Sequence, residues 1–257
     1  GGNVHIGDIV YQAAPPVAGA AALARPLNEH LSKALIAAIR PHSPTATRFW
    51  EKAEAIPNWE TNAQASNKAK EILAYSFVGV IGIQLSKLFA IGKEDFSEHI
   101  QNKFIEKCLQ VAKRSLDLVI FALVSQVWES QKTQARSFST AQTAALQDFF
   151  DRPFEPSIAG QTALFQTLHA LFTEHGLPFP FPELQGFAPR FQSGDAFQNA
   201  AGRLQQLNER WDKKSCTPVD CAAAEHALTD LLAALHFLAA CRMASIKRIG
   251  YWQIRTA

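Results

Sequence analysis

Apolar residues recur along most of the chain at the three- and four-residue spacing of amphipathic helices, so the sequence predicts a mostly α-helical protein. Pro41 ends the first predicted helix, and residues 41–59 are expected to be irregular with one short helix. Further helices are predicted around residues 162–172 and over about residues 217–245. The first helix covers about residues 23–40 and places five apolar side chains on one face: Leu27, Leu31, Leu35, Ile36 and Ile39.

The most apolar part of the sequence is the segment Ile72–Ile91, about 20 residues long with Lys87 as its only charge. We expect it to belong to a helical segment that covers about residues 61–92. A second long helix is predicted over about residues 96–132, where apolar positions again follow helical spacing. The two segments are predicted to form a long antiparallel helical hairpin, around which the C-terminal helices complete a helical bundle by covering residues 116–124.

The length of Ile72–Ile91 also permits a different function, that of a membrane-active effector which releases this segment when triggered. Gln84, Ser86 and Lys87 lie within one turn of it, and it lacks the basic flanks that orient a membrane span. The predicted partner helix is amphipathic. We therefore favour burial of the segment by protein, with insertion into a membrane as the alternative.

The two ends of the chain differ in pattern from the helical body. Residues 1–20 predict a short β-strand followed by a proline- and alanine-rich linker, and residues 21–257 predict one helical domain. Within that domain residues 246–257 are again strand-like and are interpreted as the possible start of a further β element. The expected architecture is thus a helical bundle with short strand segments at both termini.

Composition indicates a globular protein of 257 residues, with 47% hydrophobic and 19% charged residues. The net charge of +2 gives no general attraction to nucleic acid. Four cysteines without the spacing of a disulfide framework indicate reduced thiols and a cytoplasmic location. Cys216, Cys221, His226 and His236 are close in sequence, but their spacing does not suit a structural zinc site.

Catalytic motifs do not stand out in the sequence. The nucleophile elbow, the P-loop, the dinucleotide-binding glycine pattern and the zinc-protease motif are all missing, so we predict no catalytic, metal or cofactor site. An enzyme whose site is assembled from distant residues remains an alternative. Residues 177–191 hold four phenylalanines among prolines, which we expect to clamp this loop onto the core, with docking into a partner as the alternative.

Candidate partner-binding residues occur in two places, a basic row along the helix over residues 96–132 and an aromatic and basic tail. Both patterns could bind an acidic partner, and the tail resembles that of single-strand binders. We favour a solvated helix face for the row and an edge strand with one packed face for the tail, so nucleic acid is not favoured as a partner. The candidates are Lys103, Lys107 and Arg114 in the row, and Lys247, Arg248, Tyr251 and Trp252 in the tail.

The segment Gly2–Gln12, with the sequence GNVHIGDIVYQ, resembles a short junction segment of modular bacterial conflict and defence proteins. In such proteins it joins small effector-associated helical domains to proteases, nucleotidases or STAND-type NTPases. The resemblance implies a bacterial antiviral defence or stress-signalling context and a protein partner such as a protease or NTPase. Our first hypothesis is therefore a noncatalytic adaptor, sensor or protease-target module, although residues 21–257 are longer than an effector-associated domain.

Overall fold

The computed structural model describes residues 27–56, 62–134, 138–151 and 157–241. All regular secondary structure in these ranges is helical, which confirms the predicted mostly α fold. The expected strands in residues 1–20 and 246–257 lie outside the described residues. The α-helices are α1 (Glu29–Ile39), α2 (Pro44–Glu54), α3 (Ala63–Ser76), α4 (Gly79–Ile91), α5 (Glu98–Gln134), α6 (Thr140–Asp151), α7 (Ile158–His175), α8 (Ala196–Asp212) and α9 (Pro218–Ala234).

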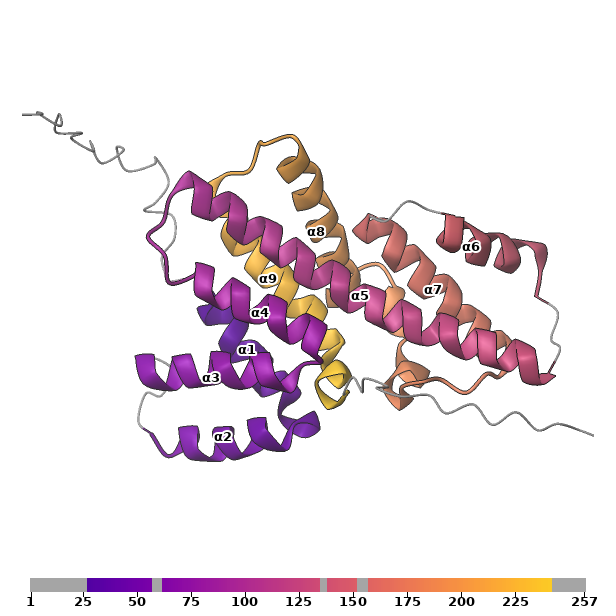
Figure 1. Ribbon diagram of the computed structural model, residues 1–257, viewed down its shortest axis with the longest axis horizontal. Coiled ribbons are helices and arrows are strands. Elements are labelled where there is room, and N and C mark those ends of the chain that lie inside the picture. Colours follow the sequence, from indigo (N-terminus) through magenta and orange to yellow (C-terminus); the bar gives the residue numbers. More distant parts are fainter. Residues whose placement is uncertain (1–26, 57–61, 135–137, 152–156, 242–257) are drawn as a thin grey trace, which may run out of the picture.

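Helix α5 is the central element of the bundle (Figure 1). It has 37 residues and is therefore about 55 Å long. Helix α4 packs on its N-terminal part, α7 lies beside its C-terminal part, and α8 and α9 pack against it as well (Figure 1). The C-terminal helices thus cover the apolar far end of α5, as the sequence pattern predicts. Its most buried side chains include Phe104, Leu116 and Leu123, all at 0% exposure.

The predicted continuous helix over residues 61–92 is wrong, because the chain breaks between α3 and α4. Phe77 and Val78 are extended, with ψ angles of 150° and 143°, and each side chain is only 3% exposed. Helix α4 packs on α5, whereas α3 turns back onto α1 and α2 (Figure 1). The long hairpin is therefore not found as predicted, since its first arm consists of two helices.

Burial on both sides explains this break better than any local signal. A straight rod would leave one end of the apolar segment uncovered, while the bend places both Phe77 and Val78 in the core. Gly82 allows the close return, because a Cβ atom there would lie 2.1 Å from the carbonyl oxygen of Ala74. Within the described residues, no helix combines the length and apolar character needed to cross a bilayer.

Helix α1 is capped by a residue that is distant in sequence. Asn28 has a left-handed backbone (φ 70°), and its side chain does not cap the helix but donates to the carbonyl of Leu88 at 3.0 Å. The cap comes from α9, where the buried Glu225 accepts a hydrogen bond from the backbone N–H of Leu31 at 3.0 Å. These contacts join α1 to α4 and to α9.

Replacing Glu225 by alanine is expected to lower the free energy of unfolding by about 1–2 kcal/mol, because the buried N–H of Leu31 loses its acceptor. Glu225→Gln retains an oxygen at the same place and should lose clearly less. Urea denaturation of the three proteins measures the difference. Equal losses for alanine and glutamine would show that the hydrogen bond does not stabilise α1.

The proline-rich loop lies against the core, which confirms the predicted clamp. It forms two short 3₁₀ helices, η4 (Pro182–Gly186) and η5 (Ala188–Phe191). The Phe179 ring stacks on Phe172 with 5.0 Å between centroids, and Phe187 is 3% exposed. The ring of His169 also forms a 2.7 Å hydrogen bond with the carbonyl oxygen of Leu184. The phenylalanines therefore hold this loop on α7.

Candidate functional site

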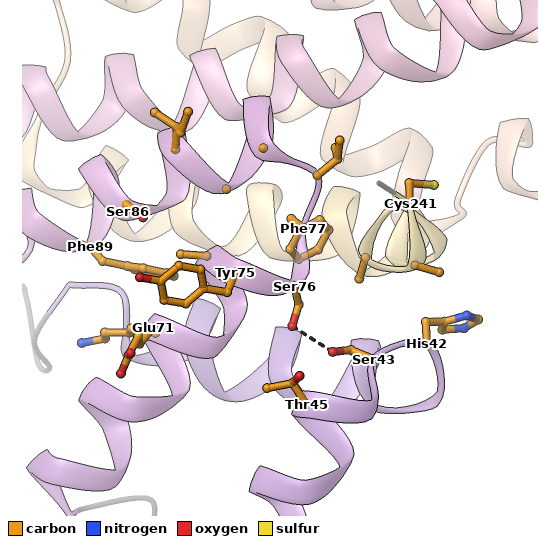
Figure 2. Close-up of a pocket in the computed structure, with 18 of the residues that line it drawn as sticks. His42, Ser43, Thr45, Glu71, Tyr75, Ser76, Phe77, Ser86, Phe89 and Cys241 are labelled. Carbon is orange, nitrogen blue, oxygen red and sulfur yellow. Dashed lines mark hydrogen bonds between the residues drawn. The ribbon is translucent and has the colours of Figure 1, made fainter. Parts of the chain in front are cut away.

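An open groove of about 1070 Å³ is lined by α2, α3, α4 and the short 3₁₀ helix η6 (His236–Ala240) (Figure 2). Its inner surface includes Phe77 and Phe89, which are 3% and 5% exposed. Tyr75 and Ile83 line the same groove but are 80% and 58% exposed. Exposed large apolar side chains beside a recess are typical of a surface that binds a partner.

The break between α3 and α4 creates this groove. Tyr75 and Ser76 end α3, Phe77 forms the break, and Ile83 follows on α4, so all four residues come to one place. Gly82 also lines the groove, where its missing side chain lets the backbone of α3 approach. The groove therefore depends on the same close contact that bends the apolar segment.

Three cations line the groove: Arg48 from α2, Lys70 from α3, and Lys93 just after α4. None of them forms an ion pair with a residue in ranges 27–56, 62–134, 138–151 or 157–241, whereas Glu71 at the same groove pairs with Lys68 at 2.7 Å. Burial lowers the pKa of Lys70, nearby Lys93 lowers it further, and the carboxylates Glu29 and Glu225 oppose this effect. The groove therefore has three cations that form no ion pair among the described residues, and its one lining carboxylate, Glu71, is paired with Lys68.

At the polar end of the groove, the serine hydroxyl groups have structural roles. Ser43 Oγ accepts the N–H of Ala46 and so caps α2, and it lies 2.9 Å from Ser76 Oγ (Figure 2). In the described part of the chain, neither hydroxyl is hydrogen-bonded to a histidine that could act as a base. This arrangement serves binding better than nucleophilic chemistry.

His42 stands at the same end of the groove as part of a stacked histidine pair. Its ring lies 4.4 Å from the ring of His236, and its Nδ1 lies 3.7 Å from a carboxylate oxygen of Glu183. Burial lowers the pKa of His42, the neighbouring His236 lowers it further, and Glu183 opposes both. The pair thus favours the neutral imidazole at this position.

The predicted basic row lies on α5, outside the groove, and each member has a partner. Lys103 forms an ion pair with Glu94 at 3.2 Å, Lys107 donates to the side-chain oxygen of Gln84 at 3.2 Å, and Arg114 lies 3.5 Å from Asp117. Burial lowers the pKa of Lys107, and the nearby carboxylate of Glu106 opposes this decrease. The tail candidates Lys247, Arg248, Tyr251 and Trp252 lie outside the described residues.

A second, smaller recess of about 290 Å³ lies where α5, α7 and α8 meet. Gln161 from α7 donates to Asp117 and to the carbonyl of Lys113, and Trp211 from α8 closes one side. Burial raises the pKa of Asp117, and the hydrogen bond from Gln161 and the charge of Arg114 oppose this rise. The main effect of these contacts is to join α7 to α5.

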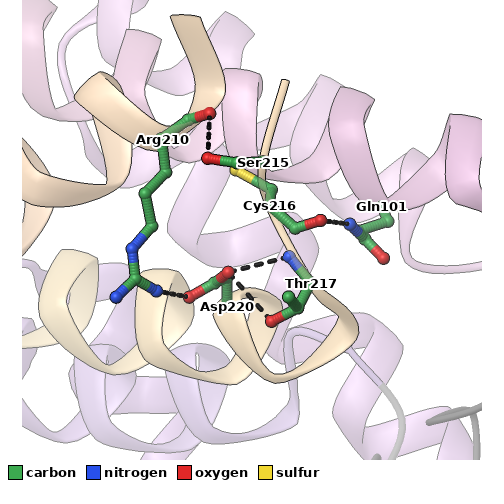
Figure 3. Close-up of polar contacts among 6 residues, drawn as sticks. All are labelled: Gln101, Arg210, Ser215, Cys216, Thr217 and Asp220. Atoms are coloured by element: carbon green, nitrogen blue, oxygen red, sulfur yellow. Dashed lines mark hydrogen bonds and ion pairs between the residues drawn. The ribbon is translucent and has the colours of Figure 1, made fainter. Parts of the chain in front are cut away.

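The four residues considered as metal ligands are not brought together. The start of α9 is a polar network (Figure 3), where Asp220 accepts from Arg210 at 2.7 Å and from the N–H of Thr217 at 2.8 Å. This confirms Thr217 as the predicted helix start. The four residues make different contacts: the Cys216 carbonyl accepts from Gln101, Cys221 is buried, and the rings of His226 and His236 lie tilted against those of His30 and His42.

Burial also makes the buried thiol of α9 a poor metal ligand. It raises the pKa of Cys221 to about 12, with further contributions from Asp220 and Cys216. Across the described residues, no group of three metal-binding side chains gathers at one point. Sequence proximity therefore misleads here, because Cys221 and His226 are five residues apart on α9 and project in different directions, while Cys216 and His236 lie outside that helix.

Sequence reasoning missed the groove. Its cations come from separate helices and are separated along the chain by at least 22 residues, so they form no local charge pattern. One weak signal in the sequence is Tyr75, an aromatic residue with a polar hydroxyl group inside the apolar segment Ile72–Ile91. In the structure its side chain faces solvent. In comparisons with known proteins, no protein-family model, curated protein or solved structure matches the chain significantly.

Proposed function

We propose that this chain is a noncatalytic interaction or regulatory module that binds a protein partner in the groove between α2, α3, α4 and η6. The observation that carries the proposal is the combination of exposed Tyr75 and Ile83 with cations that form no ion pair among the described residues, all beside a large open recess. Burying such apolar side chains against a partner is favourable, and aromatic residues are enriched where interfaces gain most of their affinity.

The junction-like segment Gly2–Gln12 supports a wider context for this role. We propose a cytoplasmic bacterial defence or stress-signalling system, in which a protease or an NTPase is the protein partner. In that setting the helical body acts as an adaptor, a sensor or a target of the protease.

The groove supports binding to protein better than the release of a membrane-active segment. Helix α4 has 13 residues and is about 20 Å long, compared with a hydrocarbon core of about 30 Å. Its buried side chains, such as Ile81 and Leu85, pack inside the bundle at 0% exposure. Release of α4 would therefore expose the core without providing a full membrane span.

The test places a photo-crosslinking amino acid at Tyr75 in the groove and, as a matched position, at Val219, which is 62% exposed and does not line the groove. In cells that naturally produce the protein, we expect a specific cross-linked partner from position 75 and none from position 219. The captured protein is then purified, and its affinity for the chain is measured by isothermal titration calorimetry.

Two matched variants connect that partner to the groove. Ile83→Asp should weaken binding about tenfold or more, because it places a charge in an apolar contact. Val219→Asp introduces the same change at a similarly exposed residue and should leave affinity unchanged. Equal affinity of the Ile83→Asp and unmodified proteins would contradict the proposal, as would turnover of a small substrate by the purified chain.

A further inference from the structure

The partner's chemistry can be deduced from the groove, provided that the proposed function holds. Arg48, Lys70 and Lys93 approach the groove from different elements, so an occupant would have cations on more than one side. Lys70 is half-buried, and Arg48 and Lys93 are exposed. Cations that face a recess and form no ion pair among the described residues favour a negatively charged occupant.

The apolar part of the groove sets a second requirement. Tyr75 and Ile83 line it together with the cations and are 80% and 58% exposed, so an occupant gains by burying apolar groups against them. A small inorganic anion meets the charge requirement but cannot fill about 1070 Å³ or use the apolar surface. The occupant therefore needs both acidic and apolar groups along one extended molecule.

We infer that the groove binds an acidic segment of the partner protein, with apolar side chains toward Tyr75 and Ile83 and carboxylates toward Arg48, Lys70 and Lys93. Single-stranded nucleic acid is the competing occupant, since it also carries negative charge. It fits less well, because such binders stack successive bases on several aromatic faces. Of the described aromatic residues that line the groove, only Tyr75 is well exposed, whereas Phe77 and Phe89 are 3% and 5% exposed.

A random linear peptide library displayed on phage, selected against the full chain, tests this inference. We expect the enriched peptides to combine aspartate or glutamate with leucine, isoleucine or phenylalanine. The most enriched peptide is then synthesised with a fluorescent label, and its dissociation constant is measured by fluorescence anisotropy. Enrichment of basic or uncharged peptides, or no enrichment at all, would overturn the inference.

A charge-reversal variant assigns the binding to the groove. Arg48→Glu combined with Lys93→Glu should raise the dissociation constant of the peptide about tenfold, equivalent to about 1.4 kcal/mol at 25 °C. Added salt should weaken peptide binding by the unmodified protein more than peptide binding by this variant. Arg203→Glu combined with Lys213→Glu changes the net charge equally at exposed positions of α8 and its end, and should have no effect. Circular dichroism verifies that both variants are folded.

The outcomes separate this inference from the proposed function. Identical peptide affinity for the two double variants would overturn the acidic partner. Binding of a labelled single-stranded DNA that depends on Arg48 and Lys93 would also overturn it, in favour of nucleic acid. If Ile83→Asp weakens binding of the captured partner while the charge reversal does not, the partner binds in the groove but does so without an acidic segment.

Discussion

Replacing Phe165 by alanine is expected to lower the free energy of unfolding by about 3–5 kcal/mol, the largest effect of the substitutions that we consider. Its side chain on α7 is 0% exposed. Its ring centroid lies 5.1 Å from that of Phe187, 5.0 Å from Phe191 and 6.1 Å from Phe197. Alanine would leave a cavity and remove the aromatic contacts that hold the proline-rich loop and α8 on α7.

Phe181→Ala is the matched control, because it makes the same change at a phenylalanine of the proline-rich loop that packs on a different residue. Phe181 is only partly buried and has its ring 5.2 Å from that of Phe237, so its loss should be about 1–2 kcal/mol. Urea denaturation of both variants gives the comparison. A loss at Phe165 no greater than that at Phe181 would contradict the importance of this aromatic cluster.

Gly82→Ala is expected to lower the free energy of unfolding by about 3 kcal/mol, because its Cβ would lie 2.1 Å from the carbonyl oxygen of Ala74. That oxygen belongs to the backbone of α3 and cannot move aside as a flexible side chain could. Helices α3 and α4 must therefore separate, which also deforms the groove. The variant should unfold at lower urea concentration and bind the groove peptide more weakly.

Gly79→Ala separates this clash from the general effect of replacing a helical glycine. A Cβ at Gly79 has nothing within 4 Å, and alanine favours helix more than glycine does. Gly79→Ala is therefore expected to be neutral or slightly stabilising. A similar destabilisation at both positions would show that close approach of α3 and α4 is not the cause.

The regular periodicity predicted those parts of the fold in which local sequence and burial agree. The apolar face of α1, including Leu31 and Leu35, is buried as predicted, and Thr217 begins α9. The same reasoning wrongly predicted a continuous helix through Phe77 and Val78, because no proline marks the end of α3 in the sequence. Contacts between α3 and α4 cause that bend, and the periodicity of a sequence does not show which helices contact each other.

The candidate site was less predictable than the fold for a related reason. Lys103, Lys107 and Arg114 form a visible row because they share one helix, yet in the structure their charges are engaged by neighbouring side chains. Arg48 and Lys93 form no row in sequence but line the same groove. Whether a cation is available depends on its acidic neighbours in space, which the order of residues along the chain does not show.

The hydrogen bond from Leu31 to Glu225 has a consequence for synthesis of the protein. The two residues are 194 positions apart, so α1 leaves the ribosome roughly 10–40 s before its cap at the usual 5–20 residues per second. During that interval the apolar face of α1 lacks α9, one of the helices that later cover it. The nascent N-terminal half therefore exposes part of its apolar surface until α9 has been made.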